Sequence, residues 1–211
     1  IVEVPYPLQG DTNLALQWVN PLMAINHNSE RLPMEKIDNL HYKLEVPLKK
    51  GDLLQYRYVK TGENSAIETG PDGLQVKSRY YFINSHSRIA DEIYGFDLNI
   101  LKSPMGLIRG TIRVQGTNES APEILINVSG ISTISSIDGS FQLQNIPAGT
   151  HNLTIFSPAG LFEPIQQQAV VEENTMTPVE VELTKKKMVN VSLIVYVSPE
   201  TSANIVLRIF V

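Results

Sequence analysis

The sequence predicts an all-β protein made of tandem β-sandwich domains of the immunoglobulin-like or prealbumin-like kind. Three observations lead to this fold class. Short runs alternate apolar and polar residues, which is the period of a half-buried strand. Gly, Pro, Asn and Asp separate these runs at the spacing expected of a sandwich. Helical periodicity is scarce, and its best candidate, residues 22–36, is interrupted by Asn26, Asn28 and Pro33.

The expected strands are short and are rich in β-branched and aromatic residues, which favour a pleated sheet. Turn residues bound each of them. They cover residues 14–19, 41–46, 53–59, 75–82, 110–114, 124–128, 140–143, 151–156, 179–183, 189–197 and 205–210.

Composition shifts divide the chain into three parts. Nearly all tyrosines precede Ser103 and Pro104, so we expect a first domain over 1–104 and a second over 105–185. A polar bridge at 184–187 then leads into two strands, and residues 193–211 repeat the strand–turn–strand pattern of residues 1–19. We therefore expect 186–211 to be the first two strands of a third, truncated module. Two strands alone bury too little surface to be stable. They are expected to pack on the second domain, or to pair with another chain or form a dimer through 188–211.

The composition excludes several classes of function. The chain has 211 residues, no cysteine and a net charge of −5. It therefore has no disulfide framework and no thiolate metal site, and it lacks the basic face of a nucleic-acid binder. No segment approaches the roughly 18 apolar residues of a membrane helix. The chain starts without Met or a signal peptide, inside what resembles a strand, which indicates a fragment of a longer protein.

The stretch SSIDGSFQLQNIPAGTHNLTI, residues 135–155, holds two turn signals and two alternating runs. Asp138 and Gly139 accept the positive φ of a tight hairpin, while Pro147 and Gly149 form a second turn. We expect a hairpin and a meander here, with Phe141 as a core anchor. Burial of that ring contributes about 1.5–3 kcal/mol.

This stretch belongs to a longer run, GLIRGTIRV…ILINVSG…TISSIDGSFQLQNIPAGTHNLTIFSPAG, that resembles the carboxypeptidase regulatory-like family. The resemblance covers residues 105–184. It implies a small transthyretin-like sandwich of about seven strands. It also implies an accessory unit of the kind attached to enzymes, transporters and adhesins.

The run LPMEKIDNLHYKLEVPLKKGDLLQYRYVKTGENSAIETGPDG, residues 32–73, resembles the middle of a starch-binding domain of carbohydrate-binding module family 20. The resemblance covers residues 1–100 and implies a β-sandwich that binds α-glucan. Two departures affect the sugar site. Ile67 stands where the family has a platform tryptophan, and no Leu-Gly-x-Trp loop is visible around residues 18–28.

Sugar recognition in such modules needs an exposed aromatic ring, which stacks on a pyranose, and flanking polar groups, which bond the hydroxyls. The alternative for the strand tyrosines is a place in the core with the hydroxyl at the rim. Tyr80 and Tyr81 are adjacent, so one of the two should be exposed. The candidate platform consists of Trp18, Tyr42, Tyr56 and Tyr58, with Asn64, Glu68 and Asp72 as hydrogen-bonding neighbours.

Other site chemistries find little support in the sequence. Loop carboxylates could bind Ca²⁺, but no Asp-x-Asp-x-Asp series occurs among Glu68, Asp72, Asp91, Glu92 and Asp97. The histidines at 27, 41, 86 and 151 lack metal-ligand spacing, and no serine lies in a Gly-x-Ser-x-Gly elbow. The sequence thus predicts no catalytic residue, no metal and no cofactor.

Two functional hypotheses remain open. In the first, the chain is a non-catalytic, carbohydrate-binding-like module of a multidomain bacterial surface or secreted protein, with a polysaccharide such as α-glucan as its partner. In the second, it is a structural spacer or adhesion module without a sugar ligand. The first requires an exposed aromatic pair on the first domain, and the second requires that the large aromatic rings are mostly buried.

Overall fold

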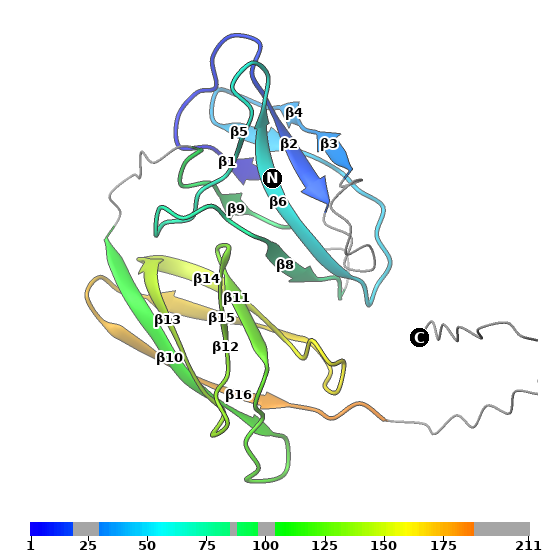
Figure 1. The fold of residues 1–211 in the computed structure, drawn as a ribbon, viewed down its shortest axis with the longest axis vertical. Coiled ribbons are helices and arrows are strands. Elements are labelled where there is room, and N and C mark those ends of the chain that lie inside the picture. The colour runs from blue at the N-terminus through cyan, green and yellow to red at the C-terminus, as the bar shows by residue number, and fades with distance from the viewer. Residues whose placement is uncertain (19–29, 85–87, 97–103, 188–211) are drawn as a thin grey trace, which may run out of the picture.

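The computed structural model describes residues 1–18, 30–84, 88–96 and 104–187 (Figure 1). The all-β fold class is confirmed, because these residues form strands and no helix. No helix in this part of the chain is therefore long and apolar enough to cross a membrane. The expected third module lies almost entirely outside the described residues, as do its strands at 189–197 and 205–210. The domain limits at 104 and 185 stay predictions.

The described residues of the first sandwich form nine strands in two sheets (Figure 1). One sheet has the order β4-β5-β1-β9, and the other has the order β3-β2-β6-β7, with β8 also paired to β6. The strands are β1 (Val2–Glu3), β2 (Asn13–Trp18), β3 (Arg31–Pro33), β4 (Glu35–Lys36), β5 (His41–Lys43), β6 (Leu53–Thr61), β7 (Ala66–Ile67), β8 (Arg79–Phe82) and β9 (Asp91–Glu92).

Alternation along β6 fills the core between these sheets. Leu54, Tyr56 and Tyr58 point inward and are buried, because every second residue of a strand faces the same side. They pack with apolar side chains of the opposite sheet, among them Val2 of β1 and Tyr42 of β5. The core of the first sandwich is therefore rich in tyrosine, and each buried hydroxyl needs a hydrogen-bond partner.

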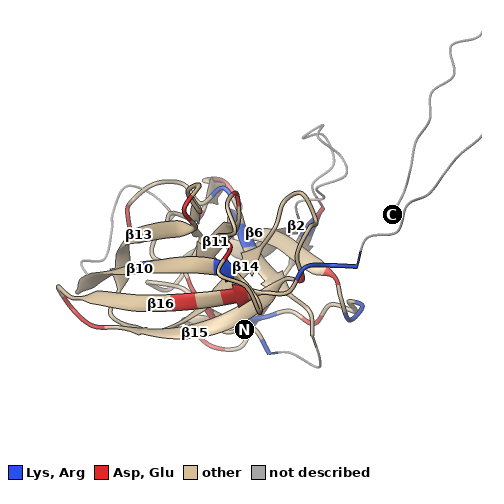
Figure 2. Cartoon of the chain, turned by 90° about the horizontal axis from the view of Figure 1, so that it is seen from below, with Lys and Arg blue, Asp and Glu red and all other residues tan. Residues whose placement is uncertain are grey.

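The second sandwich has seven strands in two sheets, of order β13-β10-β16 and β12-β11-β14-β15. Its core is aliphatic, apart from the rings of Phe141 and Phe162. Figure 2 shows charged residues on β10 and β16, where Arg113 and Glu182 are neighbours in the register. The strands are β10 (Met105–Val114), β11 (Leu125–Val128), β12 (Ile131–Ile134), β13 (Ser140–Pro147), β14 (Gly149–Phe156), β15 (Ile165–Val171) and β16 (Met176–Leu183).

Gly110 lets the central strand β10 approach both its neighbour and the core. A Cβ atom at this position would collide with the carbonyl oxygen of Val179 on β16 and would lie 2.6 Å from Cε1 of Phe141. The Phe141 ring thus occupies the space that a side chain at position 110 would need. Phe141 is buried, as its role of core anchor requires.

The expected hairpin at 137–140 is wrong. Residues on either side of this turn belong to different sheets, since β12 pairs with β11 while β13 pairs with β10. The turn at 146–149 likewise carries the chain from β13 to β14 in the other sheet. Gly139 has a φ of +78°, but Asp138 is not among the residues of positive φ; its carboxylate accepts bonds from the backbone N and Oγ of Ser140 instead.

Several strands differ in length from expectation. The expected strands at 41–46 and 75–82 shorten to β5 and β8, while those at 110–114 and 140–143 lengthen to β10 and β13. Residues 31–36 form the two short strands β3 and β4. Strand β15 was not expected, because Gln166, Gln167 and Gln168 interrupt its apolar alternation.

Candidate functional site between the two sandwiches

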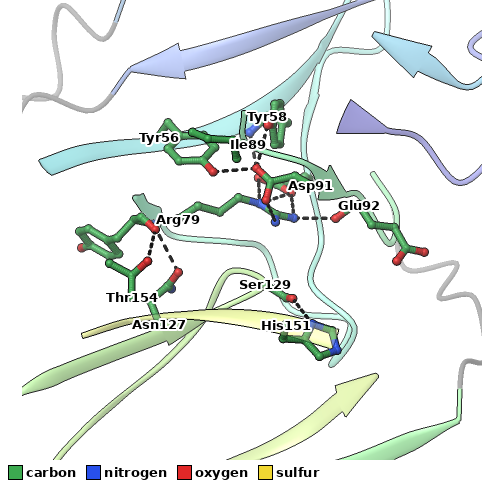
Figure 3. A network of polar contacts seen from close by, with 12 residues as sticks. Tyr56, Tyr58, Arg79, Ile89, Asp91, Glu92, Asn127, Ser129, His151 and Thr154 are labelled. Atoms are coloured by element: carbon green, nitrogen blue, oxygen red, sulfur yellow. Dashed lines mark hydrogen bonds and ion pairs between the residues drawn. The ribbon is translucent and has the colours of Figure 1, made fainter. Parts of the chain in front are cut away.

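Strand β8 of the first sandwich lies against β11 and β14 of the second (Figures 1 and 3). Asn127 of β11 bridges the two units, because its Oδ1 accepts a hydrogen bond from the backbone N of Tyr80 and its Nδ2 donates to the carbonyl of Ser78, both at 3.3 Å. The Oγ1 of Thr154 donates to the carbonyl of Tyr80 at 2.8 Å. The rings of Tyr80 and Phe156 lie 5.0 Å apart. Both polar and aromatic contacts therefore hold the sandwiches together.

A cleft of about 300 Å³ opens beside this contact, and we call it the inter-sandwich cleft. Both sandwiches contribute to its lining, so its shape depends on their relative placement. The first sandwich supplies Glu3, Tyr81 and the segment 89–92. The second supplies Ser129, Gly130 and the segment 150–152.

The floor of the cleft on the first sandwich is a network of buried charges (Figure 3). Arg79 forms a buried ion pair with Glu68, whose Oε2 lies 2.7 Å from Nη2 of Arg79. A second ion pair joins Nη1 of Arg79 to Oδ1 of Asp91 at 3.4 Å. The hydroxyls of Tyr56 and Tyr58 both donate to Oδ2 of Asp91, at 2.6 and 2.9 Å.

The strand arrangement explains why these groups meet. Tyr56 pairs with Arg79 across β6 and β8, and Tyr58 lies two residues further along on the same face. Asp91 reaches them from β9 in the opposite sheet. The network therefore links the two layers of the first sandwich through its core, and the polar groups in it are satisfied as burial demands.

Burial and charge set the pKa values in the network. Burial, followed by the negative charge of Asp91, raises the pKa of Tyr56 and of Tyr58 well above the ordinary value, so both stay neutral. Burial opposes the charge of Arg79, but the carboxylates of Glu68 and Asp91 outweigh it and raise its pKa well above the ordinary value. Burial raises the pKa of Glu68, against the opposing effect of Arg79.

On the second sandwich, a turn between β11 and β12 forms one edge of the cleft. Ser129 has a φ of +49°, which is unusual for a residue with a side chain. Its Oγ lies 3.1 Å from Nδ1 of His151. Because Nε2 of His151 lies 2.7 Å from the carbonyl of Pro147, which can only accept, Nε2 carries a proton. In the tautomer with its proton on Nε2, Nδ1 accepts a hydrogen bond from Oγ of Ser129. Tyr94 of the first sandwich lines the same cleft, and its pKa is raised by burial and then by the charge of Glu92.

The expected exposed aromatic platform is not present among its tyrosines. Tyr42, Tyr56 and Tyr58 are only 1, 2 and 3 % exposed, and Glu68 is fully buried. Tyr56 and Tyr58 turn their hydroxyls inward to Asp91 rather than outward to solvent. These rings therefore have no free face on which a pyranose could stack, and Glu68 is occupied by Arg79 and by the backbone N of Tyr58.

The other three platform residues do not lie together. Trp18 pairs with Tyr56, at the opposite end of β2 from Asn13 and Thr61. Five residues of strand separate these ends by about 17 Å. Asn64 follows Thr61 and lines a separate hollow beside Tyr6 and Leu8. Asp72 accepts a hydrogen bond from the backbone N of Leu74 within its own turn. Whether any of the seven residues binds a sugar stays a prediction.

Two of the carboxylates considered for calcium already have a cationic partner in the protein. Glu68 and Asp91 are held by Arg79, and Asp97 lies outside the described residues. Within the described part of the chain, no group of three or more His, Asp or Glu side chains could hold a metal ion.

The sequence interpretation missed most of the residues that define the cleft. Arg79 is the one residue of this group whose role the sequence indicates. An arginine at the start of an aromatic strand needs a charged partner when the strand is buried. Asn127, Ser129 and His151 gave no such signal, since their role depends on how the two sandwiches meet. The arrangement supplies fixed hydrogen-bond donors and acceptors from both units.

A family model for the β-sandwich domain of ER membrane protein complex subunit 7 matches residues 115–210, which is less than half of the chain. Most of the match falls on the second sandwich, and the family description agrees with the sandwich architecture. No curated protein matches the chain.

Among solved structures, the chain is similar to the Bacillus anthracis TIE protein, with 12 % identity and a TM-score of 0.34. The match covers 87 % of this chain and 39 % of that protein. It is also similar to GBS52, the minor pilin of Streptococcus agalactiae, with 9 % identity, a TM-score of 0.32 and coverage of 89 % and 87 %. A third similar structure is BcpA, the major pilin subunit of Bacillus cereus, with 12 % identity, a TM-score of 0.30 and coverage of 86 % and 57 %.

Proposed function

We propose that the chain is a non-catalytic structural module, in which two docked β-sandwiches form one stiff unit of a larger surface or secreted protein. The observation that carries this proposal is the contact between β8 and the strands β11 and β14. Such a unit would hold its neighbours at a fixed distance or present an adhesive surface.

The nature of the contact supports stiffness. Asn127 and Thr154 bond to three backbone groups of residues 78 and 80, so they hold the backbone at the start of β8 in place. A hydrogen bond of this kind contributes about 0.5–1.5 kcal/mol, and loss of one partner leaves a buried backbone group unsatisfied. The Tyr80–Phe156 contact adds an aromatic pair to the same interface.

Nuclear spin relaxation of the full chain tests the proposal. We expect the amides of both sandwiches to report one common rotational correlation time. In the double variant N127A/T154V, each sandwich should report its own, shorter correlation time, because the two substitutions remove all three bonds between the sandwiches. The matched control is N118A, which removes an exposed asparagine that bonds Arg113 within the second sandwich. Two independent correlation times in the unaltered protein would contradict the proposal.

The finer family assignments belong to the same proposal. The seven strands of the second sandwich support its resemblance to the transthyretin-like carboxypeptidase regulatory domains. We also propose a starch-binding type of fold for the first sandwich, although α-glucan binding at its tyrosine platform is disfavoured by burial. Affinity electrophoresis in a starch gel tests that point. We expect that substitution of the platform tyrosines leaves the mobility of the protein in the starch gel unchanged.

The place of action is proposed as outside a bacterial cell or on its surface, as the resemblance to accessory modules suggests. The matched family model, in contrast, names a complex of the endoplasmic reticulum. Protease treatment of intact host cells, followed by detection of this segment, distinguishes an external from an internal position. Dimer formation through 188–211 also stays a proposal, and light scattering of the full chain tests it.

A further inference from the structure

The inter-sandwich cleft has the size of a small-molecule site. Its volume of about 300 Å³ lies at the lower end of the range for such sites, roughly 300–1,000 Å³. Since both sandwiches line it, a ligand in the cleft would contact both at once.

The base of the cleft is fixed before any ligand arrives. Arg79, Tyr56 and Asn127 are each no more than 3 % exposed, and hydrogen bonds hold all three in place. A binding surface that is already ordered lowers the entropic cost of association.

The rim of the cleft, in contrast, has polar groups that are available to a ligand. Asn152 and Thr150 are exposed, and no hydrogen bond from their side chains occurs among the described residues. Tyr81 adds a half-buried ring from the first sandwich. The cleft thus combines an amide, a hydroxyl and part of an aromatic ring.

The charge in the cleft selects between classes of ligand. Glu3, Asp91 and Glu92 contribute three carboxylates, while Arg79 contributes one guanidinium that is already paired with Glu68 and Asp91. An anionic ligand would therefore meet net negative charge at short range. An uncharged ligand or one with an amine would not.

We propose that the inter-sandwich cleft binds a neutral or amine-bearing sugar of one or two rings. Sugar hydroxyls both donate and accept hydrogen bonds, so they can pair with the amide of Asn152 and with the hydroxyl of Thr150. The C–H face of a sugar ring complements Tyr81. This site shares only the buried Tyr56 with the tyrosine platform, and it rests on the docking of the two sandwiches that the proposed function requires.

Saturation-transfer NMR of the full chain with maltose, N-acetylglucosamine, glucosamine and glucuronate tests the proposal. We expect transfer to at least one of the first three sugars and none to glucuronate. Removal of one hydrogen-bonding group, by N152A or T150V, should weaken binding by about 2- to 10-fold. N118A, an exposed asparagine outside the cleft, should leave binding unchanged. Both cleft substitutions are at exposed positions, so thermal melting should show an intact fold.

The outcomes separate clearly. Binding that is weakened by both cleft substitutions but not by N118A supports the site. Absence of transfer to all three expected sugars overturns it, as does binding that neither cleft variant changes. Equal binding of glucuronate overturns the charge argument and the proposal with it. None of these results bears on the common correlation time that tests the structural module.

Discussion

Arg79 donates to Glu68 through two nitrogens, and both side chains are almost completely buried inside the first sandwich. A charged group in such a place is stable only while its partner is present. Each of the two residues therefore determines whether the other can stay in the core.

Replacement of Arg79 by methionine should destabilise the protein strongly. Arg79→Met leaves Glu68 and Asp91 without a counter-charge, and the loss of one partner of a buried pair costs about 3–5 kcal/mol. The matched control is Lys185→Met, because Lys185 pairs with Glu119 at 3.0 Å with both side chains largely exposed. An exposed pair contributes about 0–1 kcal/mol. Urea unfolding of both variants measures the difference, and equal midpoints would contradict the buried network.

The buried tyrosines should make the protein sensitive to alkali. The pKa values of Tyr56 and Tyr58 are raised in the folded state, mainly by burial, whereas the unfolded chain ionises them near 10.0. The folded state therefore keeps protons that the unfolded state loses, and the free energy of unfolding falls as the pH rises past 10.0. We expect tyrosinate absorbance to appear in two steps, with the second step coincident with loss of the far-ultraviolet circular dichroism signal. Ionisation of all eight tyrosines in one step, with the fold intact, would refute this expectation.

The turn at Asp138 should give a pH dependence of the opposite sign. Hydrogen bonds from the hydroxyl and the backbone N of Ser140 lower the pKa of Asp138 below its ordinary value of 3.8. The charged carboxylate thus contributes stability above pH 3.8, and this contribution is lost as the pH falls through the lowered pKa. Asp138→Ala should melt at a lower temperature than the unaltered protein at neutral pH, and the difference should shrink in acid. Asp138→Asn keeps an acceptor oxygen and serves as the control. A melting difference that is constant from neutral pH into acid would rule out the charge as its origin.

Gly110 should tolerate no side chain. Gly110→Ala forces the Phe141 ring and the backbone of Val179 to move, and overpacking of a core costs about 1–3 kcal/mol or more. Gly116→Ala meets no atom within 4 Å and suffers only from its φ of +75°, at about 1–2 kcal/mol. Phe141→Leu should recover part of the stability that Gly110→Ala loses, because it removes the ring from the collision. Combined with Gly116→Ala, it should only lower the stability further. A double-mutant cycle from thermal unfolding measures this coupling, and strictly additive effects in both backgrounds would disprove the contact.

The fold class could be predicted from the sequence because alternation is a local property. Strands such as β6 and β16 carry a clear period of two, so they lie close to their expected positions. Strands β1, β4, β7 and β9 have two residues each, which is too few to show a period. Alternation also says nothing about which strands pair. For that reason the sequence predicts a hairpin after Ser136, whereas this turn leads into the other sheet.

The candidate site was predictable only in part. The sequence predicts Tyr56, Tyr58 and Glu68 as site residues. They do belong to the charge network around Arg79, but they are buried and do not form a binding surface. Strand periodicity places Tyr56 and Tyr58 on one face without showing whether that face meets solvent or Asp91. The second sandwich supplies Asn127, Ser129 and His151 through docking, which no local pattern encodes.

The pairing of β10 with β16 has a consequence for how the second sandwich is made. β10 is the central strand of its sheet, and its parallel neighbour β16 is the last strand among the described residues. During synthesis from the amino terminus, one flank of β10 therefore stays without its partner until residues 176–183 have left the ribosome. Contacts between distant parts of a chain form slowly, so during that interval β10 presents an unpaired strand edge to other chains.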